Sequence, residues 1–120
     1  MYIKNIKEYD IEANEAEIIV SDGYYEILCY AQPFEKKDGQ FTLLGFMAKD
    51  IRKSLNNNYL IEKDLTNYFA YKLQGKLINV KNGLVAIGEI IIRIEERIPN
   101  DIRENDFIEF TVLRIDYLES

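Results

Sequence analysis

Apolar and polar residues alternate on both sides of the Asp22-Gly23 pair, in the segment EIIVSDGYYEILCY (residues 17–30). Asp-Gly is typical of a two-residue hairpin turn, which would place Ile18 opposite Ile27 and Ala16 opposite Cys29. That face is apolar, and a shift of one residue would turn the whole apolar set outward. The pattern therefore predicts a β-hairpin whose inner face carries Tyr25, Ile27 and Cys29 and whose outer, mixed face carries Tyr24, Glu26, Leu28 and Tyr30.

A second hairpin is predicted around Asn82-Gly83, because Asn-Gly supplies the positive-φ pair of a type I′ turn. The expected register has one apolar face, with Leu73 opposite Ile92 and Tyr71 opposite Ile94. The other face would carry charge, with Lys76 opposite Glu89 and Lys72 opposite Arg93. Near the turn this second face also becomes apolar, through Ile78, Val80, Val85 and Ile87. These four side chains must be shielded from water, either by a bend of the sheet or by another chain.

Residues 40–48 and 105–118 also have the composition of strands, whereas residues 49–68 show weak helical spacing and then an asparagine run. The pattern predicts six short strands joined by turns, with at most one short helix. We expect a single all-β domain over residues 1–120, built as a six-stranded antiparallel barrel or sandwich.

Two short motifs resemble parts of the OB-fold. RENDFIEF (residues 103–110) is similar to the x-E-G-D-x-(V/I)-x-F start of a late strand in small barrels. Asn105 takes the glycine position, a change that a left-handed turn position tolerates. The segment EIIVSDGYYEILCY is similar to the early hairpin of OB-type domains. The resemblance implies an OB-like barrel with a ligand face across its central strands, a face often used for oligonucleotides.

Composition indicates an ordinary globular chain, with 48% hydrophobic and 30% charged residues. Its most apolar run, GLVAIGEIIIRI (residues 83–94), is interrupted by Glu89 and Arg93 and is shorter than the roughly 20 residues of a bilayer span. The N-terminal segment carries acids where a signal peptide needs a continuous apolar stretch. Cys29 is the single cysteine, so no internal disulfide can form. We therefore expect a cytoplasmic protein that does not associate with membranes.

The sequence lacks the residues on which most catalytic sites depend. It has no histidine, and its one cysteine is predicted to lie inward beside Ile27 and Ala16. The same two facts exclude a structural zinc site of the usual kind. The acids of PNDIREND (residues 99–106) lack the ligand spacing of an EF-hand loop, and a solvated turn explains them equally well. We expect a protein that is not an enzyme and that holds neither a metal nor a cofactor.

Charge is unevenly distributed along a chain whose net charge is -6. Residues 8–26 hold seven acids and no base, whereas residues 49–81 hold seven bases and three acids, a net charge of +4. Cations interleaved with tyrosines are typical of single-strand binders, in which cations follow phosphates and rings stack on bases. The candidate nucleic-acid-binding residues are Arg52, Lys53, Tyr59, Tyr68, Lys72, Lys76 and Lys81.

Exposed tyrosines supply contact area at low entropic cost, and protein interfaces are enriched in them. The leading expectation is accordingly a protein-binding or self-assembling module that contacts a protein partner, or a second copy, through Tyr24, Glu26, Leu28 and Tyr30. The alternative is an oligonucleotide-binding OB module that uses residues 49–81. The overall acidic charge opposes this alternative, because it repels nucleic acid at long range.

Overall fold

Most of the chain is extended, and the computed structural model, which describes residues 1–35 and 40–119, contains eleven β-strands. In β10, for example, every second side chain is buried, as expected for a strand that packs on a core. The strands are β1 (Tyr2–Asp10), β2 (Glu15–Ser21), β3 (Glu26–Ala31), β4 (Phe41–Phe46), β5 (Lys49–Lys53), β6 (Leu60–Lys63), β7 (Tyr71–Asn79), β8 (Leu84–Ile87), β9 (Ile90–Arg93), β10 (Phe107–Val112) and β11 (Arg114–Glu119).

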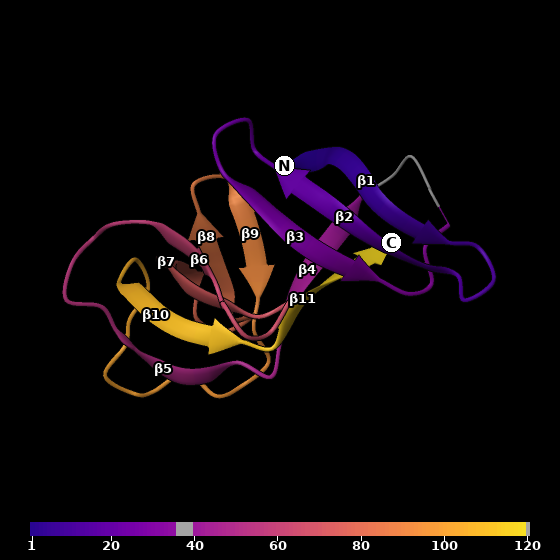
Figure 1. The fold of residues 1–120 in the computed structure, drawn as a ribbon. Helices are drawn as coiled ribbons and strands as arrows, with labels where there is room; N and C mark the ends of the chain where they lie inside the picture. Colours follow the sequence, from indigo (N-terminus) through magenta and orange to yellow (C-terminus); the bar gives the residue numbers. More distant parts are fainter. Residues whose placement is uncertain (36–39, 120) are drawn as a thin grey trace.

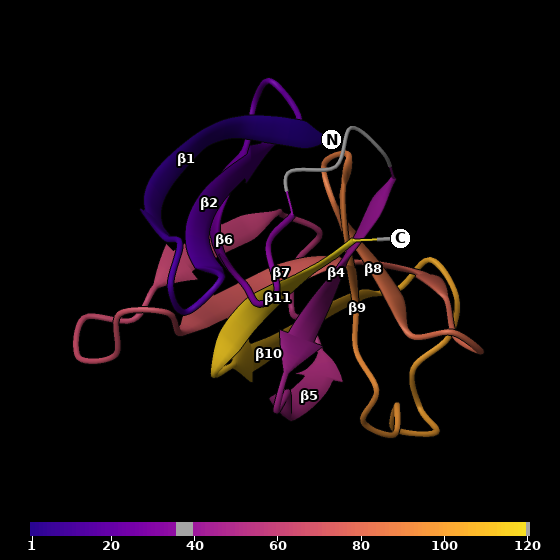
Figure 2. The same ribbon diagram turned by 90° about the vertical axis from the view of Figure 1, so that its right-hand side faces the viewer.

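The strands form one mixed sheet in the order β1-β2-β3-β11-β4-β9-β8-β7-β10-β5, with β6 paired to β7 (Figures 1 and 2). The β3–β11 and β4–β9 pairs are parallel, and the others are antiparallel. The end strands β1 and β5 do not pair, so the sheet does not close within the described residues. The all-β class is confirmed, but the predicted six-stranded antiparallel barrel is not.

The difference in strand number has local causes. The prediction missed β1, β5 and β6, and it treated β8 with β9, and β10 with β11, as single strands. Residues 49–53 and 60–63 are strands, so the short helix expected between residues 49 and 68 does not form. Across residues 1–35 and 40–119 no helix is long and apolar enough to span a bilayer.

A bent two-stranded ribbon runs from the middle of the sheet, at β4 and β11, to one of its ends, at β5 and β10. Residues 41–53 run antiparallel to residues 107–119, with Phe46 opposite Arg114 before the bend and Arg52 opposite Glu109 after it. Met47 turns the first strand with a φ of 53°, and the Leu113 N–H donates to the Phe46 carbonyl at 2.9 Å. The bend lets one ribbon contribute β4 and β11 to one part of the sheet and β5 and β10 to the other (Figure 1).

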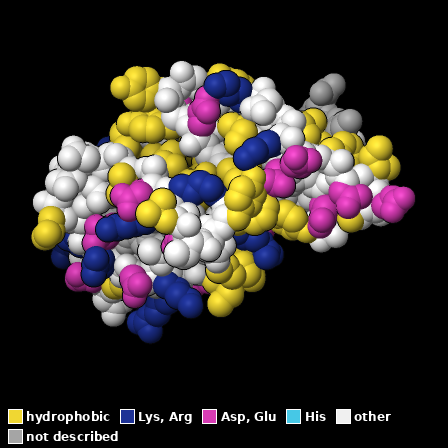
Figure 3. Space-filling view, viewed as in Figure 1, with side chains coloured by type: hydrophobic (Ala, Val, Ile, Leu, Met, Phe, Trp, Pro, Cys, Tyr) yellow, Lys and Arg dark blue, Asp and Glu magenta, His cyan; other side chains and the backbone are white. Residues whose placement is uncertain are grey.

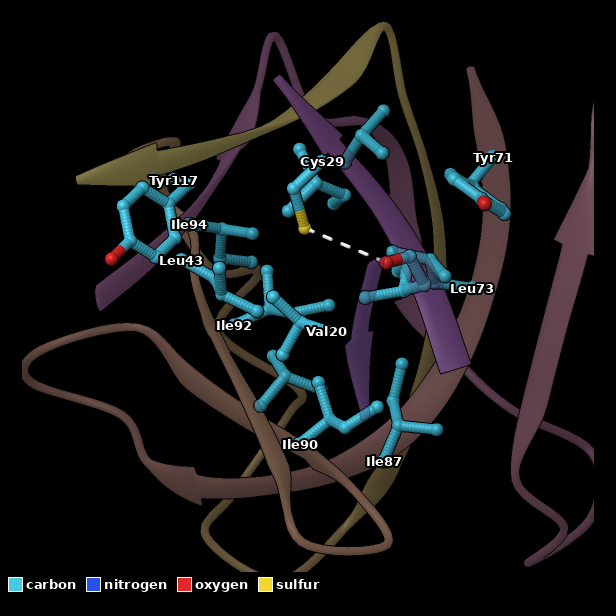
Figure 4. Packing of buried hydrophobic residues seen from close by; sticks show 14 of the residues in the cluster. Val20, Cys29, Leu43, Tyr71, Leu73, Ile87, Ile90, Ile92, Ile94 and Tyr117 are labelled. Atoms are coloured by element: carbon cyan, nitrogen blue, oxygen red, sulfur yellow. Dashed lines mark hydrogen bonds between the residues drawn. The ribbon is translucent and has the colours of Figure 1, made fainter. Parts of the chain in front are cut away.

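The coiled sheet encloses one hydrophobic core, to which its strands contribute aliphatic side chains (Figure 4). Val20, Leu73 and Ile92 are all fully buried, although they come from distant parts of the sequence. Cys29 lies among them, and its thiol contacts the Ile27 carbonyl at 3.7 Å. The predictions that Ile27, Cys29, Tyr71 and Leu73 face the core are confirmed.

The first predicted hairpin forms as β2 and β3, with its register shifted by two residues. Ile18 pairs with Cys29 and Val20 with Ile27, so the turn comprises residues 22–25 rather than Asp22 and Gly23 alone. Only Gly23 of the predicted turn pair has a positive φ. The inward and outward faces are preserved, because a shift of two residues leaves the alternation unchanged.

The second predicted hairpin is wrong in register. Gly88 adopts a φ of 60° and turns the chain, so that β8 pairs with β9 rather than continuing along β7. Lys76 lies opposite Ala86 instead of Glu89, and Lys72 lies opposite Glu62 instead of Arg93.

The prediction that four apolar residues share the charged face near the tip of this hairpin is wrong. The observed register differs from the expected one by three residues, an odd number, so Val85 and Ile87 lie on the core face of β8 and are fully buried. Only Ile78 and Val80 remain exposed.

Substitution of Gly75 by alanine tests whether β7 and β8 approach each other closely. A Cβ at this position would lie 2.5 Å from the Ala86 carbonyl oxygen and 2.8 Å from Ile87 Cγ1, so Gly75→Ala should lower the free energy of unfolding by about 1–3 kcal/mol. Gly45→Ala is the matched control, because its nearest contact is the tip of Val112 at 3.0 Å, and it should cost less. Urea titrations of both variants measure the difference, and equal losses would contradict the β7–β8 packing.

Candidate protein-binding surface

The four residues predicted to form a contact face do not share one environment. Tyr24 is 86% exposed on the β2–β3 turn, and Glu26 is an exposed partner of Lys4 in an ion pair. Leu28, by contrast, is only 4% exposed, so the prediction that it lies on an open face is wrong. Tyr30 is half-buried, and its ring contacts Phe69 of the β6–β7 connection at 5.7 Å. This connection covers the part of β3 that the local alternation left open.

An aromatic row runs from the β2–β3 turn to the start of β10. It consists of Tyr24, Tyr25, Tyr59 and Phe107, with successive ring centroids 5.0, 5.9 and 5.3 Å apart. The first two contacts are edge-to-face and the third is tilted, and ring contacts of this kind fix the side chains against one another. The row thus joins Tyr24, predicted to contact protein, with Tyr59, predicted to contact nucleic acid. Sequence reasoning missed Tyr25 and Phe107, because their contacts cross between strands that are distant in sequence.

The Asp22 carboxylate holds the turn that carries Tyr24 and Tyr25. Its Oδ1 accepts the Tyr24 and Tyr25 N–H groups at 2.9 and 2.6 Å, and its Oδ2 accepts the Glu89 N–H at 2.8 Å. Asp22 therefore ties the β2–β3 turn to the β8–β9 turn, beside Gly88. Partial desolvation acts to raise the pKa of Asp22, but the backbone N–H donors outweigh it and hold the pKa below the usual carboxyl value.

A second feature is an acidic hollow of about 370 Å³, which lies where β1 ends and β2 begins. Its lining includes the carboxylates of Glu8, Asp10, Glu15 and Glu17 and the rings of Tyr30, Tyr68 and Phe69. Glu15 accepts the Tyr30 hydroxyl at 2.5 Å, which together with burial raises the pKa of that tyrosine. In Figure 3 acidic side chains gather at the right-hand end of the molecule, where β1 and β2 meet.

The predicted nucleic-acid-binding residues are spread over several environments. Arg52 and Lys53 form ion pairs with Glu109 and Asp106, which reduces the positive charge they offer to a phosphate. Tyr68 is half-exposed, and Lys7 donates to its hydroxyl at 2.8 Å. The remaining three lysines do not cluster, since Lys72 lies between Glu62 and Thr111, Lys76 between Ala86 and Phe107, and Lys81 in the β7–β8 turn.

The Cys29 thiol and the carboxylates were the remaining candidates for a nucleophile or a metal ligand. Burial raises the pKa of the Cys29 thiol far above its usual value, with a smaller contribution from Asp116, so the thiolate nucleophile is not formed near neutral pH. In the part of the chain that the structure describes, no group of three or more Cys, Asp or Glu residues is arranged to hold a metal ion. The carboxylates of the acidic hollow line it without converging on one point.

Replacing Asp22 by Asn should remove the acceptor for the Glu89 N–H and lower the free energy of unfolding by about 1.5 kcal/mol or more at neutral pH. The folded-state pKa of Asp22 is depressed, so its stabilisation is complete above the unfolded-state pKa and is lost as the pH falls through the folded-state value. The difference between wild type and Asp22→Asn should therefore shrink between pH 7 and about pH 2. Denaturant titrations across this range measure it, with the exposed Asp101→Asn as control. A difference independent of pH would refute the role of the carboxylate.

Comparison with known proteins does not place this chain in a family. No family model matches the chain, and no curated protein and no solved structure matches it. The resemblance to OB-folds therefore stays at the level of short motifs, of which the left-handed Asn105, with a φ of 74°, is confirmed. What is established is an all-β fold that presents an aromatic row at one place and an acidic hollow at another.

Proposed function

We propose that this protein is a non-catalytic protein-binding module whose contact surface is the aromatic row. The observation that carries the proposal is the continuity of the row: four rings in successive contact begin at Tyr24, which is 86% exposed, and continue through Tyr59, which is 37% exposed. Rigid aromatic side chains bury a large area on binding and lose few rotamers, and Tyr is enriched where binding energy concentrates.

Support also comes from how firmly the row is held. Asp22 binds the N–H groups of Tyr24 and Tyr25, and Tyr59 packs against Phe107 of β10. A contact surface fixed before binding loses less conformational entropy when the partner arrives. Of the four residues first expected to form the contact, Tyr24 belongs to the row and Glu26 flanks it. The buried Leu28 and Tyr30, whose ring packs against Phe69, have no part in it.

Site-specific photocrosslinking tests the proposal. A benzophenone side chain placed at Tyr24 or Tyr59 should give covalent adducts with a protein of defined mass in the cells that express this chain. The same group at Leu118, which is 36% exposed near the end of β11, is the matched control and should give none. Adducts with nucleic acid only, or equal adducts at all three positions, would overturn the proposal.

The alternative, oligonucleotide binding, is favoured by one observation: Lys76 lies opposite Phe107, so a cation borders the end of the row. The ion pairs of Arg52 and Lys53 and the net charge of -6 weigh against it.

Titration of a fluorescent single-stranded oligonucleotide at two salt concentrations separates the two functions. We expect no saturable binding at micromolar protein. Salt-sensitive binding that Lys72→Glu with Lys76→Glu abolishes would reverse the order of the two functions.

A further inference from the structure

The loop that joins β5 to β6, residues 54–59, buries a polar side chain against the outer face of β7. Gln74 follows the exposed Lys72 by two residues, so it belongs to the face of β7 that points away from the core. It is nevertheless only 5% exposed. Its Nε2 donates to Asn56 Oδ1 at 2.6 Å and to the Asn58 carbonyl at 2.8 Å. The buried amide of Gln74 therefore holds the loop against the sheet.

Further hydrogen bonds fix the loop at its start and in its middle. The Ser54 N–H donates to the Phe107 carbonyl at 2.9 Å. The Asn58 N–H donates to Asn56 Oδ1 at 3.1 Å. The loop thus begins beside Phe107 and ends at Tyr59, and these two residues form one end of the aromatic row. A loop tied in this way loses little conformational entropy when it meets a partner.

This fixed loop presents an apolar side chain to solvent. Leu55 is completely exposed, and no charged residue lies between positions 54 and 59. The segment SLNNNY also has the composition of binding loops, in which Tyr supplies contact area and Ser and Asn supply adaptable hydrogen bonds. The centre of a protein interface is likewise depleted in charged residues. Exposure, rigidity and composition all indicate a contact loop.

We infer that Leu55 is the anchor residue of the protein-binding surface and inserts into an apolar pocket of the partner protein. The inference rests on the proposed function, since it extends the aromatic row by the loop of residues 54–59. An aliphatic anchor that enters a pocket, surrounded by a polar rim, is a common centre of a protein interface. The amides of Asn56, Asn57 and Asn58 supply the polar rim. Gln74 is a positioning residue, because it holds the loop without being accessible to the partner.

The chemistry of the loop favours a protein over the other possible occupants. A leucine side chain offers neither a charge to a phosphate nor a ring to a base, so it adds nothing to the binding of a single strand. One leucine among asparagines is also too little apolar surface to hold a membrane.

Competition with purified protein tests the inference. The signal is the protein adduct formed by a benzophenone at Tyr24, and unlabelled variants are added as competitors. Burial of one leucine side chain corresponds to a change of about tenfold or more in affinity, so Leu55→Asp should need at least about tenfold more protein than wild type to suppress the adduct. Leu65→Asp is the matched control, because Leu65 is equally exposed but lies between β6 and β7, and it should compete like wild type.

Two further variants test the role of Gln74. Gln74→Met keeps the length of the side chain but removes its N–H donors, and Asn56→Ala removes the acceptor at an exposed position. Each should compete about two- to tenfold more weakly than wild type. Hydrogen exchange at the Asn58 N–H should accelerate, whereas the amides of β2 should stay as protected as in wild type. A general loss of stability would instead accelerate both.

The outcomes separate the inference from the proposed function. Equal competition by Leu55→Asp and wild type, with the Tyr24 adduct still formed, would overturn the inference and leave the proposed function intact. The absence of any protein adduct at Tyr24 would remove both. A benzophenone placed at Leu55 should capture the same protein as one at Tyr24, and crosslinks to nucleic acid or lipid alone would overturn the inference.

Discussion

The shared bend of residues 41–53 and 107–119 is the constraint on which the rest of the architecture depends. Without the bend, β4 would continue straight into β5, and β10 straight into β11. The ribbon could then contribute to only one side of the core. The left-handed φ of Met47 and the hydrogen bond from Leu113 to Phe46 fix the change of direction. Short strands can then coil around one core, since twist and bends let a sheet cover both sides of its own interior.

This coiling also explains where polar features gather. It brings the β2–β3 turn beside the β8–β9 turn, so that a single carboxylate, Asp22, serves both. It also lays the β6–β7 connection over β3, which buries part of the expected contact face and moves the exposed aromatic surface to the row that starts at Tyr24. The surface proposed for protein binding is thus a product of contacts between distant segments.

Several features could be predicted from local sequence. Alternation placed Ile27, Cys29 and Leu73 in the core, and Asn105 was expected to tolerate a left-handed conformation. The register of the first hairpin shifted by two residues because the Asp22 side chain organises a longer turn, yet its faces survived, since the side-chain period of a strand is two. The prediction of the second hairpin failed for two reasons. An irregularity between Leu77 and Asn79 changes the pairing of β7 with β8, and Gly88, which was taken as part of a strand, ends β8 with its positive φ.

The sequence by itself therefore determined the all-β class, the inward face of the first hairpin and the absence of histidine chemistry, because these depend on composition and on neighbours two residues apart. Tertiary structure alone decided the sheet order, the burial of Leu28, the contact between Tyr25 and Tyr59, and the position of the acidic hollow beside Tyr68 and Phe69. These features join residues far apart in the chain, and their pairing is selected by the packing of the whole core rather than by any local pattern.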